Sequence, residues 1–157
     1  MPHVLVLPED DANRQIANGF VTFSGIDPGR IQVLPPPGGW TKVLEALQRD
    51  QLADLRRFAE RMLVLVIEFD GDAGRLGEAI SRIPADVQDR VFILGARTEP
   101  ERLKQALPGC HSSEAIGRAL AEDCQANTRN AWVQPDLECN LAELNRMNAT
   151  VRACLFG

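Results

Sequence analysis

The segment LVLVIEFDGD, Leu63–Asp72, decides the fold that the sequence predicts. Its five consecutive apolar residues, 63–67, and Phe69 predict a strand buried on both faces, as in the middle of a parallel sheet. Asp70 and Asp72 follow at the end of that strand. Because ligands of open α/β sheets bind beyond the carboxyl ends of the strands, we expect both carboxylates at a functional site.

Composition narrows the class of protein. A chain of 157 residues with 45% apolar and 25% charged residues predicts one globular domain, 1–157. The formal net charge of −5 argues against broad electrostatic binding of nucleic acid. No apolar run approaches the roughly 20 residues that span a bilayer, and the N-terminus lacks the pattern of a signal peptide. We therefore expect a cytoplasmic protein that makes no membrane contact.

Three further apolar runs, 3–7, 31–34 and 90–94, predict strands, and helical patterns lie between the four runs. This alternation predicts a three-layer α/β fold with a mainly parallel four-stranded sheet and right-handed crossovers. The predicted α/β core covers 3–107, and a C-terminal helical extension covers 108–157.

The helices of the core are expected at 12–23, at 41–62 with a break near Asp50, at 72–83 and at 98–107. The last of these begins with a T-x-x-E capping box, which would satisfy Glu101 structurally.

In the extension, a helix over 113–126 has Ser112 or Ser113 as its cap, and a final amphipathic helix follows. Its apolar face is formed by Leu137, Leu141, Leu144, Met147, Val151 and Leu155. We expect this face to pack on the sheet, with a homodimer interface as the alternative.

Three carboxylates are the candidate site. If the strand order is second, first, third, fourth, the ends of the first and third strands are neighbours, and Glu9 meets Asp70 and Asp72. Three carboxylates in one place repel one another unless a cation neutralises them. Because carboxylate oxygens are hard ligands, the expected cation is Mg²⁺ or Mn²⁺. A metal held there activates water and stabilises charge on a phosphoryl group. In the structural alternative, Asp70 and Asp72 only cap the following helix and Glu9 is solvated.

A glutamate at the end of the first strand and a D-x-D at the end of the third resemble the Toprim domain of bacterial primases, type IA and II topoisomerases and overcoming-lysogenization-defect nucleases. The resemblance covers 3–107. It implies that Glu9 is the acid/base or metal-linked glutamate, that Asp70 and Asp72 hold Mg²⁺, and that the substrate is a nucleic acid or another phosphodiester. The sequence contains no tyrosine, which excludes a topoisomerase-type tyrosine nucleophile within these residues.

Two alternatives stay open. The opening strand with its acidic pair also resembles response-regulator receiver domains, which implies that Asp10 and Asp11 bind Mg²⁺ and Asp70 accepts a phosphoryl group. The other alternative is a non-catalytic interaction module. Three further residues are candidates for the site: Glu68, Asp11 and Lys42. Glu68 lies on the same strand face as Asp70.

Overall fold

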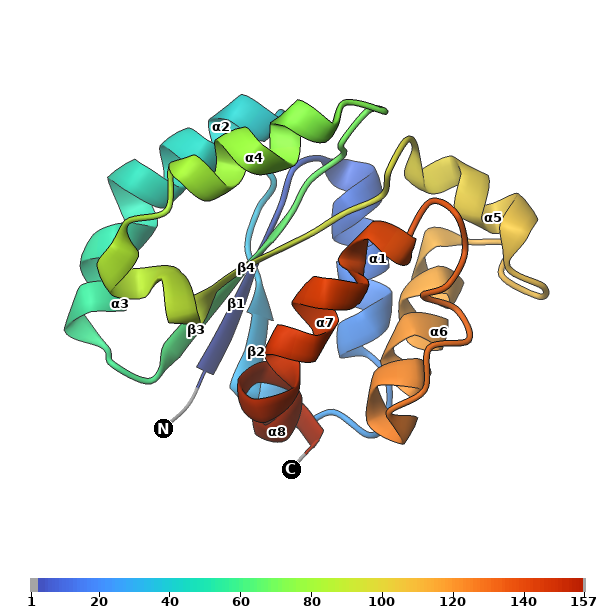
Figure 1. Ribbon diagram of the computed structural model, residues 1–157. Coiled ribbons are helices and arrows are strands. Elements are labelled where there is room, and N and C mark those ends of the chain that lie inside the picture. The colour runs from blue at the N-terminus through green and yellow to red at the C-terminus, as the bar shows by residue number, and fades with distance from the viewer. Residues whose placement is uncertain (1–2, 157) are drawn as a thin grey trace.

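The computed structural model describes residues 3–156 and shows a parallel sheet between two layers of helices (Figure 1). The strands are β1 (His3–Pro8), β2 (Ile31–Val33), β3 (Arg61–Val66) and β4 (Val91–Leu94). They lie in the order β2-β1-β3-β4, and every neighbouring pair is parallel. The predicted fold class is confirmed, and the strand order is the one on which the site prediction depends.

β3 is buried on both faces, as its sequence predicts. Met62 and Val64 belong to the hydrophobic core on one side of the sheet, whereas Leu63 and Leu65 belong to the core on the other side. The alternation follows from the two-residue period of a strand, and its uninterrupted apolar character follows from having a helical layer on each face.

One helical layer comes from the segments between β2 and β4. It contains α2 (Trp40–Ala46), α3 (Leu52–Arg57) and α4 (Ala73–Ser81), which lie on the same side of the sheet in Figure 1. A π-helical turn, Leu47–Gln51, joins α2 to α3. The break expected near Asp50 is therefore a widened turn within one continuous helical path.

The opposite layer combines the first helix with the C-terminal ones. It contains α1 (Asp11–Val21), α6 (Ser113–Ala126), α7 (Leu141–Met147) and, after a π-helical turn at Asn148–Arg152, α8 (Ala153–Phe156). The side chain of Ser112 accepts a hydrogen bond from the Ala115 N–H, so the cap predicted for α6 is confirmed. The extension thus completes the second layer of the fold.

The apolar face of the final helical segment packs within the chain. Five of its six predicted positions are buried in the core of the second layer, and Leu141 is partly buried against it. The predicted packing of this face on the sheet is confirmed.

The helix after β4 begins differently from the prediction. The hydroxyl of Thr98 donates to the Asp136 carboxylate (2.8 Å), and no side chain caps the helix. The chain starts as a 3₁₀ turn at Pro100–Arg102 and continues as the short α5 (Leu103–Ala106). The predicted capping box is wrong because a partner distant in sequence takes the threonine hydroxyl, and Glu101 lies exposed.

The outer edge of β4 is paired by side chains of α7. The Ile93 N–H donates to the Glu143 carboxylate (2.8 Å), and Arg146 donates to the Val91 carbonyl (2.6 Å). An unpaired edge strand is a template for association with another strand. In this protein, helix side chains occupy the positions that a fifth strand would take.

The crossing of α1 and α6 predicts a severe effect of one methyl group. A Cβ at Gly117 would lie 2.0 Å from the Ile16 carbonyl oxygen, so Gly117→Ala must push the two helices apart. We expect a loss of roughly 1–3 kcal/mol in the free energy of unfolding, measured by urea denaturation. Gly77→Ala in α4 is the matched control, since nothing lies within 4 Å of the added Cβ. It should be neutral or stabilise by up to about 1 kcal/mol. Equal losses in the two variants would contradict the close helix contact.

Candidate metal centre

Three carboxylates converge where β1 and β3 end. Glu9 and Asp10 follow β1, Glu68 follows β3, and each offers one oxygen to a group whose members lie within 4.8 Å of one another. The two strands are adjacent and parallel. From β1 the chain continues to β2 at one edge of the sheet, and from β3 it continues to β4 at the other edge. The cluster therefore occupies the switch point of the sheet, where α/β proteins bind ligands.

Glu9 is fixed by the backbone around it. Its carboxylate is buried, with the residue only 6% exposed, and accepts a hydrogen bond of 2.6 Å from the Glu68 N–H. Its own N–H donates to the Val66 carbonyl (2.8 Å), and its carbonyl accepts from the N–H groups of Gly38 and Gly39. Both glycines have positive φ, which favours glycine in the loop that covers this residue. The position of Glu9 is thus set before any ligand binds.

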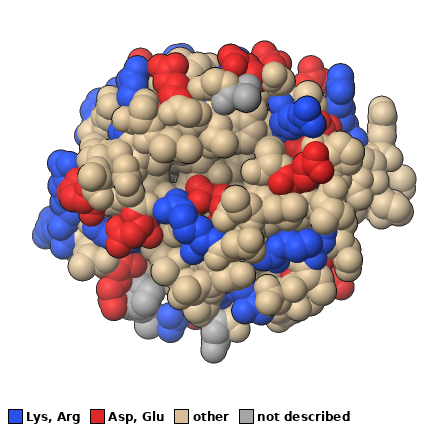
Figure 2. Space-filling model, in the orientation of Figure 1, with Lys and Arg blue, Asp and Glu red and all other residues tan. Residues whose placement is uncertain are grey.

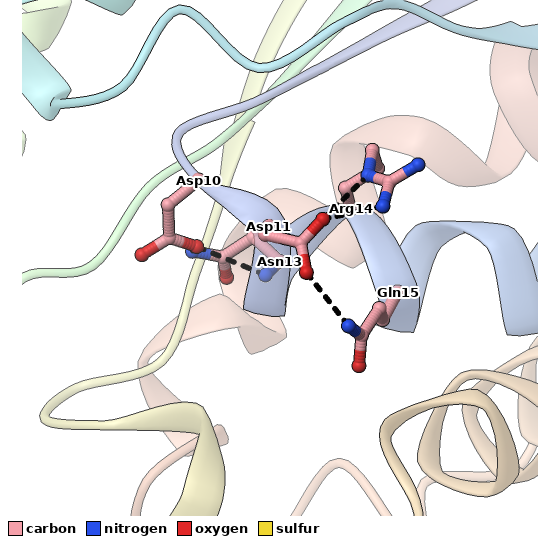
Figure 3. Close-up of polar contacts among 5 residues, drawn as sticks. All are labelled: Asp10, Asp11, Asn13, Arg14 and Gln15. Carbon is pink, nitrogen blue, oxygen red and sulfur yellow. Dashed lines mark hydrogen bonds and ion pairs between the residues drawn. The ribbon is translucent and has the colours of Figure 1, made fainter.

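Asp10 is both the N-cap of α1 and a member of the cluster. Its Oδ1 accepts from the Asn13 N–H (3.0 Å) and from the Asn13 side-chain amide (2.8 Å), while its other oxygen points away from the helix (Figure 3). Asp11 instead bonds Arg14 and Gln15 on the exposed side of α1. Those two partners lower the pKa of the Asp11 carboxyl. Only the first member of the acidic pair reaches the cluster.

Glu68 has a raised pKa. Burial raises the pKa of its carboxyl to about 7, with further contributions from the negative charges of Asp10, Glu9, Glu101 and Glu99. The pKa of Glu9 is also raised, chiefly by burial, although the hydrogen bond from the Glu68 N–H opposes the shift. The carboxylates repel one another, and the site therefore favours added positive charge, either protons or a cation.

The nearest guanidinium leaves the cluster incompletely neutralised. Arg75 donates to the Glu68 carbonyl (2.9 Å), pairs with the Asp70 carboxylate at 3.5 Å, and lies over the Trp40 ring at 5.1 Å. Its charge lowers the pKa of Glu9, but this effect is smaller than that of burial. On the face seen in Figure 2, acidic and basic side chains are interspersed, without a continuous basic area.

The two aspartates predicted as ligands have other contacts. Asp70 has φ +51° and a side chain that is 67% exposed, paired with Arg75. Asp72 is the N-cap of α4 and accepts from the Gly74 N–H (2.8 Å), as the structural alternative predicts. Among residues 3–156, the carboxylate group at the switch point includes Glu9 of the three predicted ligands, and metal binding by the two aspartates stays a prediction.

The strand period explains why Glu68 joins the cluster. The N–H groups of Ile67 and Phe69 donate to β4-side carbonyls, of Leu94 and Ala96, and both side chains enter the α2–α4 core. Glu68 therefore points to the opposite face, towards the start of α1. The signal in the sequence is a single charged residue, Glu68, between the apolar residues Ile67 and Phe69.

Lys42, another candidate residue, lies exposed on α2.

The donor set fits a hard divalent cation. Mg²⁺ typically uses one or two carboxylates and keeps several waters, and Mn²⁺ accepts the same oxygen ligands. Here one buried and two half-buried carboxylates lie together, backbone N–H groups donate to Glu9 and Asp10, and burial raises the pKa of Glu9 and of Glu68. Glu9, Asp10 and Glu68 are the residues that would hold the ion.

Fold and site together define a three-layer α/β protein with an acidic group at its switch point. Comparison of the chain with protein-family models, curated proteins and solved structures gives no match. Within residues 3–156, no helix is long and apolar enough to cross a membrane.

The raised pKa of Glu68 predicts a pH-dependent stability. Between about pH 4.5 and about 7, the folded protein keeps a proton that the unfolded chain releases, so stability falls as pH rises through this window. Glu68→Gln is neutral at every pH and should avoid this loss. We expect its melting temperature to exceed that of the wild type at pH 8 and the difference to vanish below pH 4.5.

Thermal unfolding over a pH series, without divalent ions, measures the effect. Glu45→Gln on the exposed side of α2 is the control for a change of one charge. A pH dependence that is the same in both variants would show that the Glu68 carboxyl does not experience the predicted repulsion.

Proposed function

We propose that the protein binds Mg²⁺ or Mn²⁺ at Glu9, Asp10 and Glu68 and uses the ion in Toprim-like phosphodiester chemistry on a nucleic acid or another phosphate-containing substrate. The observation that carries the proposal is the approach of three carboxylates to within 4.8 Å at the switch point of the sheet. Burial and the negative charges of Asp10 and Glu9 raise the pKa of Glu68, and this mutual repulsion supports a cation as the partner of the group.

The residues divide into three roles. Glu9 and Asp10 are held by hydrogen bonds and would act as fixed ligands. Glu68, whose pKa burial raises to about 7 in the metal-free cluster, would be the third ligand, and a bound ion would favour the charged form of its carboxyl. Arg75 lies beside the cluster with its guanidinium positioned to contact a phosphate. The ion, when bound, supplies Lewis acidity and charge stabilisation.

Asp70 belongs to a second version of the same function. Its exposed carboxylate lies two residues beyond Glu68 and, if it left Arg75, would reach the rim of the site, as the Toprim resemblance implies together with Asp72. The receiver-like alternative uses Asp70 as the phosphoryl acceptor. Its exposure and its position after β3 support that role, whereas Asp11, one of the implied Mg²⁺ ligands, is bonded to Arg14 and Gln15.

Metal binding separates the two ligand sets. We expect Glu9→Gln and Glu68→Gln to weaken Mn²⁺ binding by roughly tenfold or more, because each removes a ligand charge from the cluster. Asp70→Asn and Asp72→Asn remove the same charge outside it and should change the affinity by less than about twofold; Asn also suits the positive φ at 70 and the cap at 72.

Electron paramagnetic resonance of free Mn²⁺ measures the four dissociation constants. Weaker binding in Glu9→Gln, Asp70→Asn and Asp72→Asn, with unchanged affinity in Glu68→Gln, would assign the ion to the set of Glu9, Asp70 and Asp72. An absence of binding in the wild-type protein would overturn the metal site itself.

Activity tests the second half of the proposal. We expect cleavage of single- or double-stranded DNA or RNA with Mg²⁺ or Mn²⁺, lost with EDTA and in Glu9→Gln, and kept in Asp72→Asn. Gel electrophoresis of labelled strands measures it. Stable modification of Asp70 by acetyl phosphate, detected by mass spectrometry, would favour the receiver-like alternative. Mn²⁺ binding without either reaction would leave a cation-binding interaction module.

A further inference from the structure

Arg75 is held beside the acidic cluster by two contacts that involve no carboxylate. It lies in the first turn of α4, where its guanidinium donates to the Glu68 carbonyl (2.9 Å) and lies over the Trp40 ring at 5.1 Å. Trp40 is half-buried and packs against the core of the α2–α4 layer. Because the carbonyl and the ring both orient the planar guanidinium, its remaining N–H groups point in a set direction.

The ion pair of Arg75 with Asp70 is long and exposed. The distance from Arg75 Nη2 to Asp70 Oδ2 is 3.5 Å, and the Asp70 side chain is 67% exposed. Exposed ion pairs contribute little to stability. The backbone on either side of Asp70 is fixed independently, since the N–H groups of Phe69 and Gly71 donate to carbonyls of the loop after β4 (3.0 and 2.7 Å). The Asp70 carboxylate can therefore leave Arg75 by rotation of its side chain, while the loop stays in place.

Asp70 differs from its neighbour Asp72 in its role at the start of α4. Asp72 caps the helix by accepting a hydrogen bond from the Gly74 N–H. Asp70 instead has φ +51°, a left-handed conformation that non-glycine residues adopt rarely and that occurs often at functional sites. The start of α4 thus does not depend on the Asp70 carboxylate.

A phosphate group makes the same demand on a guanidinium as a carboxylate does. Both accept parallel hydrogen bonds from its N–H groups. The charge of Arg75 acts on the proposed metal ligands, since it lowers the pKa of Glu9. A phosphate on Arg75 would therefore lie close enough to a bound ion for both positive charges to act on it.

We propose that Asp70 is an internal competitor for the phosphate subsite of the metal centre, and that a substrate phosphate displaces its carboxylate from Arg75 once the ion is bound. This inference rests on the proposed function, and it adds the group that holds the phosphate and the group that has to leave. The exchange replaces one ion pair of Arg75 by another, and no covalent bond changes.

Inorganic phosphate in the presence of saturating Mg²⁺ is the probe, and NMR of the full chain is the measurement. The chain contains two tryptophans, so two indole N–H signals report on two places. Trp40 lies against Arg75, whereas the Trp132 N–H donates to the Leu120 carbonyl in the other layer. We expect phosphate to cause a saturable shift of the Trp40 signal and to leave the Trp132 signal unchanged.

Two neighbouring aspartates give a matched pair of variants. Asp70→Asn should bind phosphate about two- to fivefold more tightly than the wild type, because the competing ion pair is gone. Asp72→Asn removes the same charge without touching Arg75 and should bind phosphate as the wild type does. Asparagine suits both positions, as a residue of positive φ and as a helix cap. Equal phosphate affinities in the two variants would overturn the competition.

Arg75→Gln tests the subsite itself and should weaken phosphate binding at least about tenfold, because a charged donor is lost. Arg82→Gln is its control, since Arg82 lies just after α4 and pairs with Glu78 at 3.3 Å. Phosphate affinity that is the same in Arg75→Gln and Arg82→Gln would overturn the role of Arg75. If Arg75→Gln does not fold, the comparison of the Asp70 and Asp72 variants still decides the proposal.

Mn²⁺ binding, measured separately by electron paramagnetic resonance, distinguishes this inference from the proposed function. A wild-type protein that binds Mn²⁺, but whose Trp40 signal does not respond to phosphate with Mg²⁺, would overturn the phosphate subsite and leave the metal site standing. A wild-type protein that binds no Mn²⁺ would overturn both.

Discussion

The hydrogen bond from the Glu68 N–H to the Glu9 carboxylate is the contact on which the acidic site depends. The β1–β3 ladder ends at Pro8, and the Glu9 side chain then takes the place of a strand carbonyl as the acceptor. A charged acceptor strengthens the hydrogen bond. Because the bond is buried, losing the Glu9 acceptor would leave the Glu68 N–H unpaired, which costs free energy. Glu9 thus joins two strand ends and, through the same carboxylate, brings its charge close to that of Glu68. The hydrogen bond itself lowers the pKa of Glu9, but burial outweighs it, and the nearby charge of Glu9 adds to the burial that raises the pKa of Glu68.

At the other side of the sheet, the edge of β4 shows how polar side chains replace a strand. Asn140, Glu143 and Arg146 are three residues apart and bond backbone groups at Gly95, Ile93 and Val91, which are two apart. Three helical residues advance about 4.5 Å, whereas two strand residues advance about 6.6 Å. The growing length of the side chains, from Asn through Glu to Arg, makes up the difference. The sheet therefore ends at four strands with its edge paired, and the chain after β4 is free to form the second helical layer.

The sequence predicted the features that depend on interactions between residues close together in the chain. The apolar run at 63–67 and the alternation of strands and helices gave the sheet and its layers, and Ser112 gave the start of α6, because burial period and capping act within a few residues. The membership of the site was only partly predictable. Glu9 is in the cluster, but Asp70 turns outward at a residue of positive φ, which no periodic pattern encodes. The hydroxyl of Thr98 is taken by Asp136, 38 positions away, and such long-range pairs leave no local signature.

In the proposed function, the charges around the site determine whether the ion or the substrate binds first. The chain carries a net charge of −5, and Glu99 and Glu101 add negative potential to the cluster at Glu68. A phosphodiester approaching this edge without a cation meets repulsion from five carboxylates and attraction chiefly from Arg75, whose guanidinium is already engaged by Asp70 and the Trp40 ring. Repulsion over these short distances acts within the Debye length at physiological salt. In the proposed function the divalent ion therefore has to bind first, because only its charge reverses the sign of the site that the substrate meets.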